Sequence, residues 1–172
     1  MPIRDAKEQD CAEIADIYNH AVLNTAAIWN DSVVDGPNRI AWMQQRQSLG
    51  YPVIVAEQDG CVVGFASFGD WRAFDGYRYT VEHSVYVHPK HHGKGIGKTL
   101  MVRLIELAQA LDKHAMVAGI ESENAASLHL HRQLGFIETA RMPEVGAKFG
   151  RWLDLTFMLL LLDERESPEP AK

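Results

Sequence analysis

Apolar residues along the chain change from helical to strand-like spacing and back, which predicts a mixed α/β (α+β) domain. A short strand is expected over residues 3–6 and an amphipathic helix over residues 38–48. Between them, a first helix follows Asp10, a candidate N-cap residue, and its apolar face is formed by Ile14, Ile17, Tyr18, Ala21 and Val22. Residues 24–37 are expected to form a loop because they contain a Gly36-Pro37 break.

The middle of the chain has the pattern of consecutive strands. Residues 53–57 and 61–68 are apolar runs, and the Asp59-Gly60 pair between them is a strong hairpin signal. An aromatic and charged loop, residues 69–79, leads to a third strand over residues 80–87. Pro89 ends that strand because proline cannot donate to a β-ladder.

The last third of the chain alternates helices and strands. A glycine-rich turn at residues 93–97 opens a helix whose leucines recur at helical spacing, at Leu100, Leu104, Leu107 and Leu111. A buried strand is expected over residues 115–120, a helix over 124–134 and final strands over 136–140 and 153–162. Residues 1–163 are therefore expected to form one domain with a mixed sheet, and residues 164–172 a disordered tail.

Composition excludes several classes of function. The 172 residues fit one domain, and 47% hydrophobic residues suffice for a full core. A net charge of −6 offers no basic footprint for nucleic acid. The longest apolar run, residues 157–162, is too short to span a membrane, and the first residues do not resemble a signal peptide. The two widely spaced cysteines, Cys11 and Cys61, favour a reducing compartment, so a cytoplasmic location is expected.

The strongest chemical signal is the turn that contains Gly93, Gly95 and Gly97. Alternating glycines allow backbone N–H groups to converge on one anion, and the following helix adds the positive end of its dipole. Lys94 and Lys98 add local charge. The segment therefore predicts a phosphate-binding cradle in a protein that is acidic overall.

Three interpretations of this turn are open from the residues alone. It could simply start a helix, or it could bind the pyrophosphate of coenzyme A. The third interpretation is a Walker A loop, because Gly97-Lys98-Thr99 ends like one. That motif requires a glycine five residues before Gly97, where this chain has His92. The neighbouring His88, His91 and His92 have no nearby carboxylate or cysteine in the motif, so no metal site is predicted.

Two motifs resemble the GNAT superfamily of N-acetyltransferases. Residues 92–97 (HGKGIG) resemble its Gln/Arg-x-x-Gly-x-Gly/Ala signature, with His92 at the usual Gln or Arg position. Asn124, Ser127, His131 and Gly135-Phe136 resemble a family helix whose Asn contacts the pantetheine arm and whose Tyr position is occupied here by His131. The resemblance implies a GNAT fold, with a mostly antiparallel mixed sheet and helices on both faces. It also implies acetyl-CoA as cosubstrate, bound by Val85, Tyr86, Val87, His92, Gly93, Lys94, Gly95, Ile96, Gly97, Lys98, Asn124 and Ser127.

A closer resemblance covers residues 3–163. Residues 80–87 (TVEHSVYV), 69–72 (GDWR) and 148–152 (KFGRW) are similar to phosphinothricin and methionine sulfone or sulfoximine N-acetyltransferases, as are Tyr18-Asn19, Trp29-Asn30 and Leu130-His131. In that branch, His at the position of His131 is usual. The resemblance implies acetyl transfer to the α-amine of a small amino-acid analogue by a homodimer.

Glu82 is the candidate general base. An amine attacks a thioester only when neutral, and a base accelerates such a step by roughly 10²–10⁴-fold. Glu82 interrupts an apolar strand, and the resembling enzymes have Glu in this role. His83 alternates to the opposite face and is expected to be a hydrogen-bonded core residue. His131 is a second candidate, which would return a proton to the coenzyme thiolate. Neither cysteine lies beside a base, so direct transfer in a ternary complex is predicted, with backbone N–H groups near residues 85–87 polarising the thioester.

Arginines beside the aromatic loop are candidates for the carboxylate of an amino-acid substrate, because a guanidinium binds both oxygens at once. The expected substrate-binding residues are Trp29, Arg72, Asp75, Gly76, Tyr77, Arg78 and Lys148. Alternatives with the same fold are an aminoglycoside, polyamine or peptide N-terminus as acceptor, and Arg72 and Arg78 argue against a polycationic acceptor. A non-catalytic acyl-CoA sensor is a further alternative, and it would not need Glu82.

Overall fold

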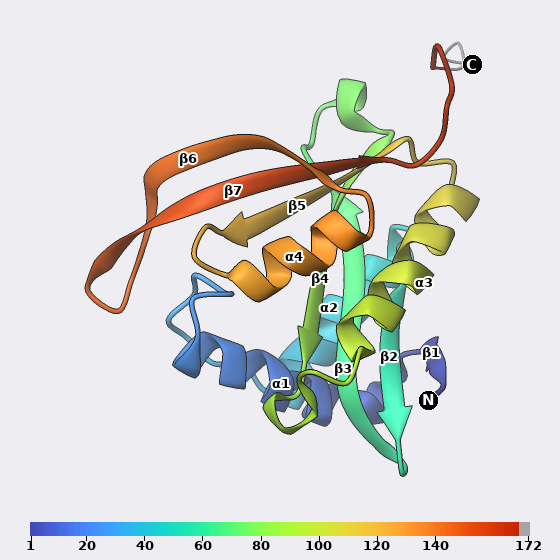
Figure 1. The fold of residues 1–172 in the computed structure, drawn as a ribbon. Helices are drawn as coiled ribbons and strands as arrows, with labels where there is room; N and C mark the ends of the chain where they lie inside the picture. The colour runs from blue at the N-terminus through green and yellow to red at the C-terminus, as the bar shows by residue number, and fades with distance from the viewer. Residues whose placement is uncertain (169–172) are drawn as a thin grey trace.

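The computed structural model describes residues 1–168 as a central twisted sheet with helices on both faces (Figure 1). The seven strands have the order β1-β2-β3-β4-β5-β7-β6. Their bounds are Ile3–Asp5 (β1), Val53–Gln58 (β2), Cys61–Asp70 (β3), Thr80–Val87 (β4), Ala115–Glu121 (β5), Ile137–Lys148 (β6) and Arg151–Leu161 (β7). Only β4 and β5 are parallel, and every other neighbouring pair is antiparallel. The predicted α/β fold with a mixed, mostly antiparallel sheet is confirmed.

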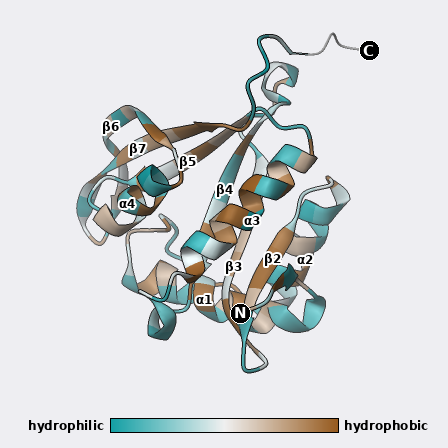
Figure 2. Cartoon of the chain, turned by 45° about the vertical axis from the view of Figure 1, so that its right-hand side comes forward, coloured by the Kyte–Doolittle hydropathy of each residue, from teal (hydrophilic) through white to brown (hydrophobic). Residues whose placement is uncertain are grey.

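Two helices cover each face of the sheet. The helices are α1 (Cys11–Asn24), α2 (Gly36–Ser48), α3 (Ile96–Ala110) and α4 (Ala125–Gln133). On one face, α1 and α2 bury residues such as Ile14 and Met43 against Phe65 of β3. On the other, the leucines of α3 pack on the sheet together with Leu128 of α4, and Figure 2 shows apolar residues along the middle of α3. The apolar spacing read from the sequence therefore marks the two core layers.

Local turn chemistry agrees with the sequence at the β2–β3 hairpin. Asp59 and Gly60 both have positive φ, of 53° and 80°. Two consecutive left-handed residues are the requirement of a two-residue type I′ turn, which explains the Asp-Gly pair. The start of α2 is also locally encoded, because the Asp35 carboxylate accepts a hydrogen bond from the Asn38 N–H at 2.9 Å.

The strands β4 and β5 separate after a short stretch of pairing, and this separation positions the site. Their parallel register covers only Thr80–Glu82 against Ala115–Val117. Farther along β4, the His88 N–H donates to Val63 O at 2.9 Å, on the β3 side. Because N–H directions alternate along a strand, those of Val85 and Val87 point to the opposite side, where β5 has moved away. The edge of β4 is therefore open at these two residues.

Two segments differ from the expected elements. The strands β6 and β7 continue through residues 141–152 as a long hairpin that projects from the body of the domain (Figure 1). After β7, Arg165, which lies within the predicted tail, forms ion pairs with Asp112 and Asp163 at 2.9 and 2.8 Å. Residues 169–172 of that predicted tail lie outside the described residues. In residues 1–168, no helix is both long and apolar enough to cross a membrane.

Candidate active site

A cleft of about 870 Å³ opens where β4 and β5 separate, between the end of α1, the start of α3 and the inner side of α4. It brings together most of the residues expected to bind the cosubstrate. Those that line it are Val85, Tyr86, Val87, His92, Gly93, Gly95, Ile96, Gly97, Lys98, Asn124 and Ser127, and His131 also lies on its wall. Lys94 does not line the cleft, and this residue is exposed.

The glycine-rich turn presents free backbone donors to this cleft. Gly95 is the N-cap residue of α3 and has a φ of 78°, a conformation that residues with a Cβ adopt only at a cost. The first helical hydrogen bond runs from the Thr99 N–H to Gly95 O. The N–H groups of residues 96–98 therefore have no partner within the helix, which is the arrangement that binds a phosphate. The His92 ring donates to Val87 O at 2.8 Å and ties the turn to β4.

The first turn of α4 forms the other side of the cleft. The Asn124 side-chain oxygen caps this helix by accepting from the Ser127 N–H at 3.1 Å. Its amide NH₂ group remains available to a carbonyl of a bound molecule. With the open N–H groups of Val85 and Val87 opposite, the cleft offers amide-binding groups on both sides. This donor and acceptor set fits the pyrophosphate and the amide-containing arm of coenzyme A.

Glu82 lies on the α1 and α2 side of the sheet, at the point where β4 and β5 separate. Its Oε1 is 3.1 Å from the position that a Cβ on Gly119 would take, and Gly119 lines the cleft. The missing side chain at position 119 therefore leaves room beside the carboxylate. Burial raises the pKa of Glu82, while the positive charges of Arg72 and Arg46 act in the opposite direction. A carboxylate whose pKa is raised is a stronger base than an exposed glutamate, which suits a group that must accept a proton.

His83 and His131 form a stacked imidazole pair on the opposite side of the sheet, in which His131 is buried and His83 is partly exposed at the cleft. The His131 Nδ1–H donates to Ser127 O at 2.7 Å, and the two Nε2 atoms are 3.0 Å apart. Burial lowers the pKa of both rings, to about 3 for His83, so both are neutral at pH 7. The His83 Nε2–H then donates to His131, and the only N–H of His131 is bound to a carbonyl. This geometry does not fit His131 as a direct proton donor to a thiolate, and it instead fits a pair that holds α4 on β4.

We expect the His83–His131 pair to make the protein less stable at acid pH. The folded pKa of His83 is about 3 against an unfolded value of 6.5, so the unfolded chain binds more protons between these values. Stability is therefore complete above pH 6.5, and it falls by up to about 1.4 kcal/mol per pH unit below it. His83→Gln removes the ionisable ring and should flatten this slope, measured as urea unfolding free energies at pH 5.0, 6.0 and 7.5.

The matched control is His129→Gln, because His129 is exposed on the same helix as His131. This control should keep the slope of the unmodified protein. An identical slope for His83→Gln would show that the imidazole pair does not control the acid sensitivity.

The expected substrate-binding residues of the aromatic loop lie in different surroundings. The Arg72 guanidinium stacks on the Trp71 ring, 4.6 Å from the ring centroid. Its positive charge acts to lower the pKa of Glu82. Arg78 instead donates to Asp75 O at 2.8 Å. The turn at residues 75–78 is exposed and does not line the cleft. The structure therefore brings Arg72, but not the turn at residues 75–78, close to Glu82.

Lys148 differs from its expected role as a substrate ligand. Its side chain is buried, and its ammonium donates to Thr25 O at 2.8 Å and also to Val22 O and Ile28 O. These three bonds use all the donors of the ammonium group. Lys148 therefore fixes the end of α1 to β6 and has no N–H left for a substrate.

Trp29, another of the expected substrate-binding residues, belongs to the same junction. Its Nε1–H donates to Ala26 O at 2.8 Å, and its ring covers Gly146 of β6, where a Cβ would lie only 2.2 Å from a ring atom. Trp29 does not line the cleft, but Ala26 does. The ring thus supports the loop that forms the cleft wall.

Sequence reasoning did not identify Arg46, Gly69 and Gly119 as site residues. Arg46 has the pattern of an ordinary polar residue on an amphipathic helix, and only the folded structure brings it over the sheet. For the two glycines, the available signal was a glycine inside an apolar strand, which often marks close approach of another group.

Comparison with known proteins agrees with this geometry. The profile described as the acetyltransferase (GNAT) family matches residues 6–136. This chain belongs to the GNAT family. Among its relatives, the L-amino acid N-acyltransferase MnaT of Escherichia coli K12 is 67% identical over 98% of both chains. The L-methionine sulfoximine/L-methionine sulfone acetyltransferase of Salmonella typhimurium is 66% identical, over 98% of this chain and 99% of that protein.

A solved structure and a more distantly related protein, both named as acetyltransferases, are also similar to this chain. The solved structure of yncA from Salmonella typhimurium with its cofactor acetyl-CoA has a TM-score of 0.96 and 65% identity, and the match covers 99% of this chain and 98% of that one. A phosphinothricin N-acetyltransferase of Alcaligenes faecalis is 33% identical, over 98% of this chain and 86% of that protein. The predicted GNAT fold and the resemblance to these N-acetyltransferases are confirmed.

Proposed function

We propose that this GNAT enzyme transfers the acetyl group of acetyl-CoA to the α-amine of small amino-acid analogues such as methionine sulfone, methionine sulfoximine and phosphinothricin. The observation that carries the proposal is the carboxylate of Glu82 beside Gly119, at the end of a cleft lined by free backbone donors. Acetyl-CoA supplies the acetyl group in activated thioester form. Relatives of this chain carry the names of acetyltransferases for these same amino-acid analogues.

In this proposal, each group of the chain has one task. The N–H groups of residues 96–98 bind the pyrophosphate, and the open edge of β4 at Val85 and Val87 holds the arm and polarises the carbonyl. Glu82 accepts the proton that the substrate ammonium must lose, directly or through a water molecule. The new C–N bond forms as the C–S bond breaks, and the proton balance is completed at the thiolate from solvent. Arg72 attracts the substrate carboxylate.

A thiol-release assay with acetyl-CoA tests the proposed function. The panel is methionine sulfone, methionine sulfoximine, phosphinothricin, kanamycin, spermidine and a short peptide. Turnover confined to the three amino-acid analogues is the expected result. Turnover on only the other amines would contradict the substrate class while leaving the cosubstrate assignment intact. Tight acetyl-CoA binding without turnover on any of them would favour a sensor.

We also propose that the enzyme is a homodimer that associates through the β6–β7 hairpin. The strand β6 is at the edge of the sheet, and nearly all of its residues are exposed. The hairpin also exposes large apolar side chains, namely Ile137, Met142, Val145, Phe149 and Trp152. An unpaired strand edge can pair with another chain, and exposed apolar patches mark protein–protein interaction sites.

The expected result is a dimer mass in light scattering at micromolar concentration, and a monomer after the double substitution Val145→Lys and Trp152→Glu. The matched control is Leu111→Lys, an exposed apolar residue at the end of α3, which should stay dimeric. A monomeric mass for the unmodified protein would contradict this assembly.

A further inference from the structure

Arg46, near the end of α2, lies directly on the backbone of β3. A Cβ built on Gly69 would be 1.4 Å from Arg46 Nη1 and 2.6 Å from its Cζ. The guanidinium therefore occupies the space that any side chain at position 69 would fill. This places a positive charge on the α1 and α2 face of the sheet, in the middle of a domain that is otherwise acidic.

The register of the sheet places this charge beside the candidate base. Gly69 pairs with Glu82 across β3 and β4, so positions 69 and 82 share one face of the sheet. Directly opposite positions have Cβ atoms about 4.5–5.5 Å apart, which puts the guanidinium over Gly69 next to the Glu82 side chain. The two groups do not form an ion pair in the described structure, whose ion pairs all involve other residues. Both Arg46 and Arg72 oppose the burial-induced rise in the Glu82 pKa, so both charges reach this carboxylate.

Arg46 and Arg72 also share an unusual lack of partners. Every other arginine in residues 1–168 donates at least one side-chain hydrogen bond, whereas these two donate none within that range. A guanidinium has five N–H donors in a fixed fork, and its usual partner is a carboxylate. Two such forks with free donors, both acting on one carboxylate, form a site with two positive charges and one negative charge.

We propose that Arg46 is a substrate-binding residue that, with Arg72, holds the α-carboxylate of the amino-acid substrate, so that the α-amine lies at Glu82. The inference rests on the proposed function and deepens it. An α-amino acid carries its positive and negative groups on the same carbon, and the site presents the opposite charges side by side. These residues then recognise the α-ammonium and α-carboxylate groups of the substrate, and other residues contact its side chain. The carboxylate is required because without it two positive charges would face an ammonium.

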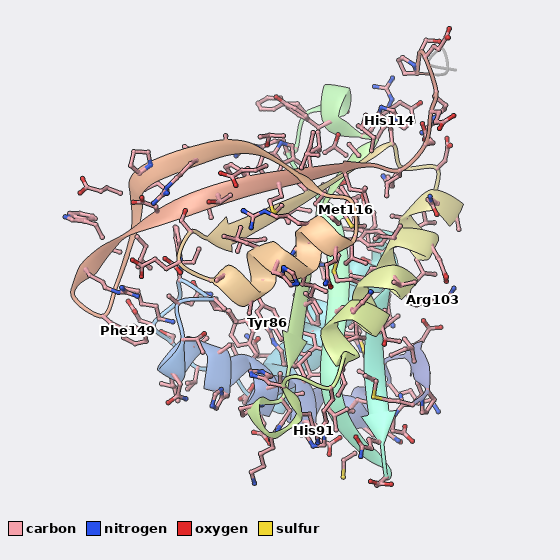
Figure 3. All side chains as sticks on the ribbon, viewed as in Figure 1. Tyr86, His91, Arg103, His114, Met116 and Phe149 are labelled. Carbon is pink, nitrogen blue, oxygen red and sulfur yellow. The ribbon has the colours of Figure 1, made fainter. Side chains whose placement is uncertain are left out.

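The test compares two substrates that differ only in the carboxylate, methionine sulfone and 3-(methylsulfonyl)propylamine, its decarboxylated form. The variants are Arg46→Met, which keeps the stem, Arg46→Lys, which keeps the charge, and Gly69→Ala, whose Cβ displaces the guanidinium. The control is Arg103→Met, because Arg103 is exposed on α3, on the far side of the sheet, and within residues 1–168 pairs only with Glu106 (Figure 3). The KM for acetyl-CoA and the melting temperature are measured for each variant.

We expect Arg46→Met to lower kcat/KM for methionine sulfone by roughly 10- to 100-fold, mainly through KM, since a charge-assisted bidentate contact is lost. The decarboxylated amine should change less than threefold, so the preference for a carboxylate shrinks by the same factor. Gly69→Ala should act in the same direction, Arg46→Lys should recover part of the loss, and Arg103→Met should change nothing. The KM for acetyl-CoA should stay constant throughout.

The outcomes separate this inference from the proposed function. Turnover of methionine sulfone by the unmodified enzyme, with no loss or an equal loss for both substrates in Arg46→Met, would overturn the role of Arg46 alone. If the unmodified enzyme acetylates neither substrate, the proposed function fails and the inference fails with it. If Arg46→Met does not fold, Arg46→Lys and Gly69→Ala decide the question on the same pair of substrates.

Discussion

Glu82→Gln is expected to lower kcat by roughly 10²–10⁴-fold, which is the usual contribution of a positioned general base. Gln has nearly the same shape, so the side chain should keep its place beside Gly119 while the ability to accept a proton is lost. The KM or Kd for acetyl-CoA should not change, because the residues proposed to bind the cosubstrate lie farther along the cleft, at the glycine turn and α4. Steady-state rates with methionine sulfone and calorimetric titration with acetyl-CoA measure the two quantities separately.

The pH profile gives an independent check on this base. Because burial raises the pKa of Glu82, the acid limb of kcat/KM should lie at higher pH than for an exposed glutamate. Arg72 opposes this rise, so Arg72→Met should move the acid limb to higher pH still. Glu106→Gln on the exposed face of α3 is the control and should leave rate and profile unaltered. A Glu82→Gln enzyme with an unaltered rate at every pH would remove Glu82 from the mechanism.

Lys148→Met is expected to destabilise the fold by about 3 kcal/mol, because an unsatisfied buried polar group costs roughly 1–3 kcal/mol and three carbonyls lose their donor together. For a domain of this size, that loss lowers the melting temperature by roughly 6–12 °C. Met fills a similar volume, so the loss reports the hydrogen bonds and not a cavity. Urea unfolding and thermal melting measure the effect.

Lys7→Met serves as the comparison for Lys148→Met, since Lys7 is exposed and its side chain has no role in a junction between elements. It should unfold like the unmodified protein. Equal midpoints for Lys148→Met and Lys7→Met would show that the α1–β6 junction does not depend on the ammonium. The Lys148→Met enzyme should also have a weakened cleft wall at residues 25–27, seen as a higher KM for acetyl-CoA.

Most elements of the fold were predictable because their signals are local. The Asp59-Gly60 turn determines its own backbone conformation, and the leucines of α3 identify a buried face at helical spacing. The glycine cradle was predictable for the same reason, because donors and dipole come from consecutive residues. Such features need no information about the rest of the chain.

The β6 strand was only partly predictable because its pairing is tertiary. Residues 141–148 of this strand lack the apolar alternation of a half-buried strand, and Pro143 and Gly146 disfavour strand formation. The strand forms by hydrogen bonding to β7, and its register shifts twice along the way. A pattern search sees residues 141–148 as a loop for these reasons.

The role of Lys148 and the position of Arg46 were beyond sequence reasoning because their partners are remote. The carbonyls that bind Lys148 lie 120 to 126 residues earlier in the chain, at a helix end that looks unremarkable in sequence. Arg46 reaches the site by covering a glycine in β3. Backbone carbonyls and absent side chains leave no residue type to recognise, so contacts of this kind appear only in three dimensions.

The separation of β4 from β5 has a consequence for how such an enzyme can change its substrate. In the proposed function, main-chain groups on the open edge of β4 and at the start of α3 bind the acetyl donor, and most substitutions leave these groups in place. The side chains proposed to bind the acceptor, those of Arg46, Arg72 and Glu82, can each be altered by a single codon change. Laboratory selection for a new amine should therefore enrich substitutions around the acceptor while donor specificity stays constant. The two halves of the reaction can thus evolve at different rates within one fold.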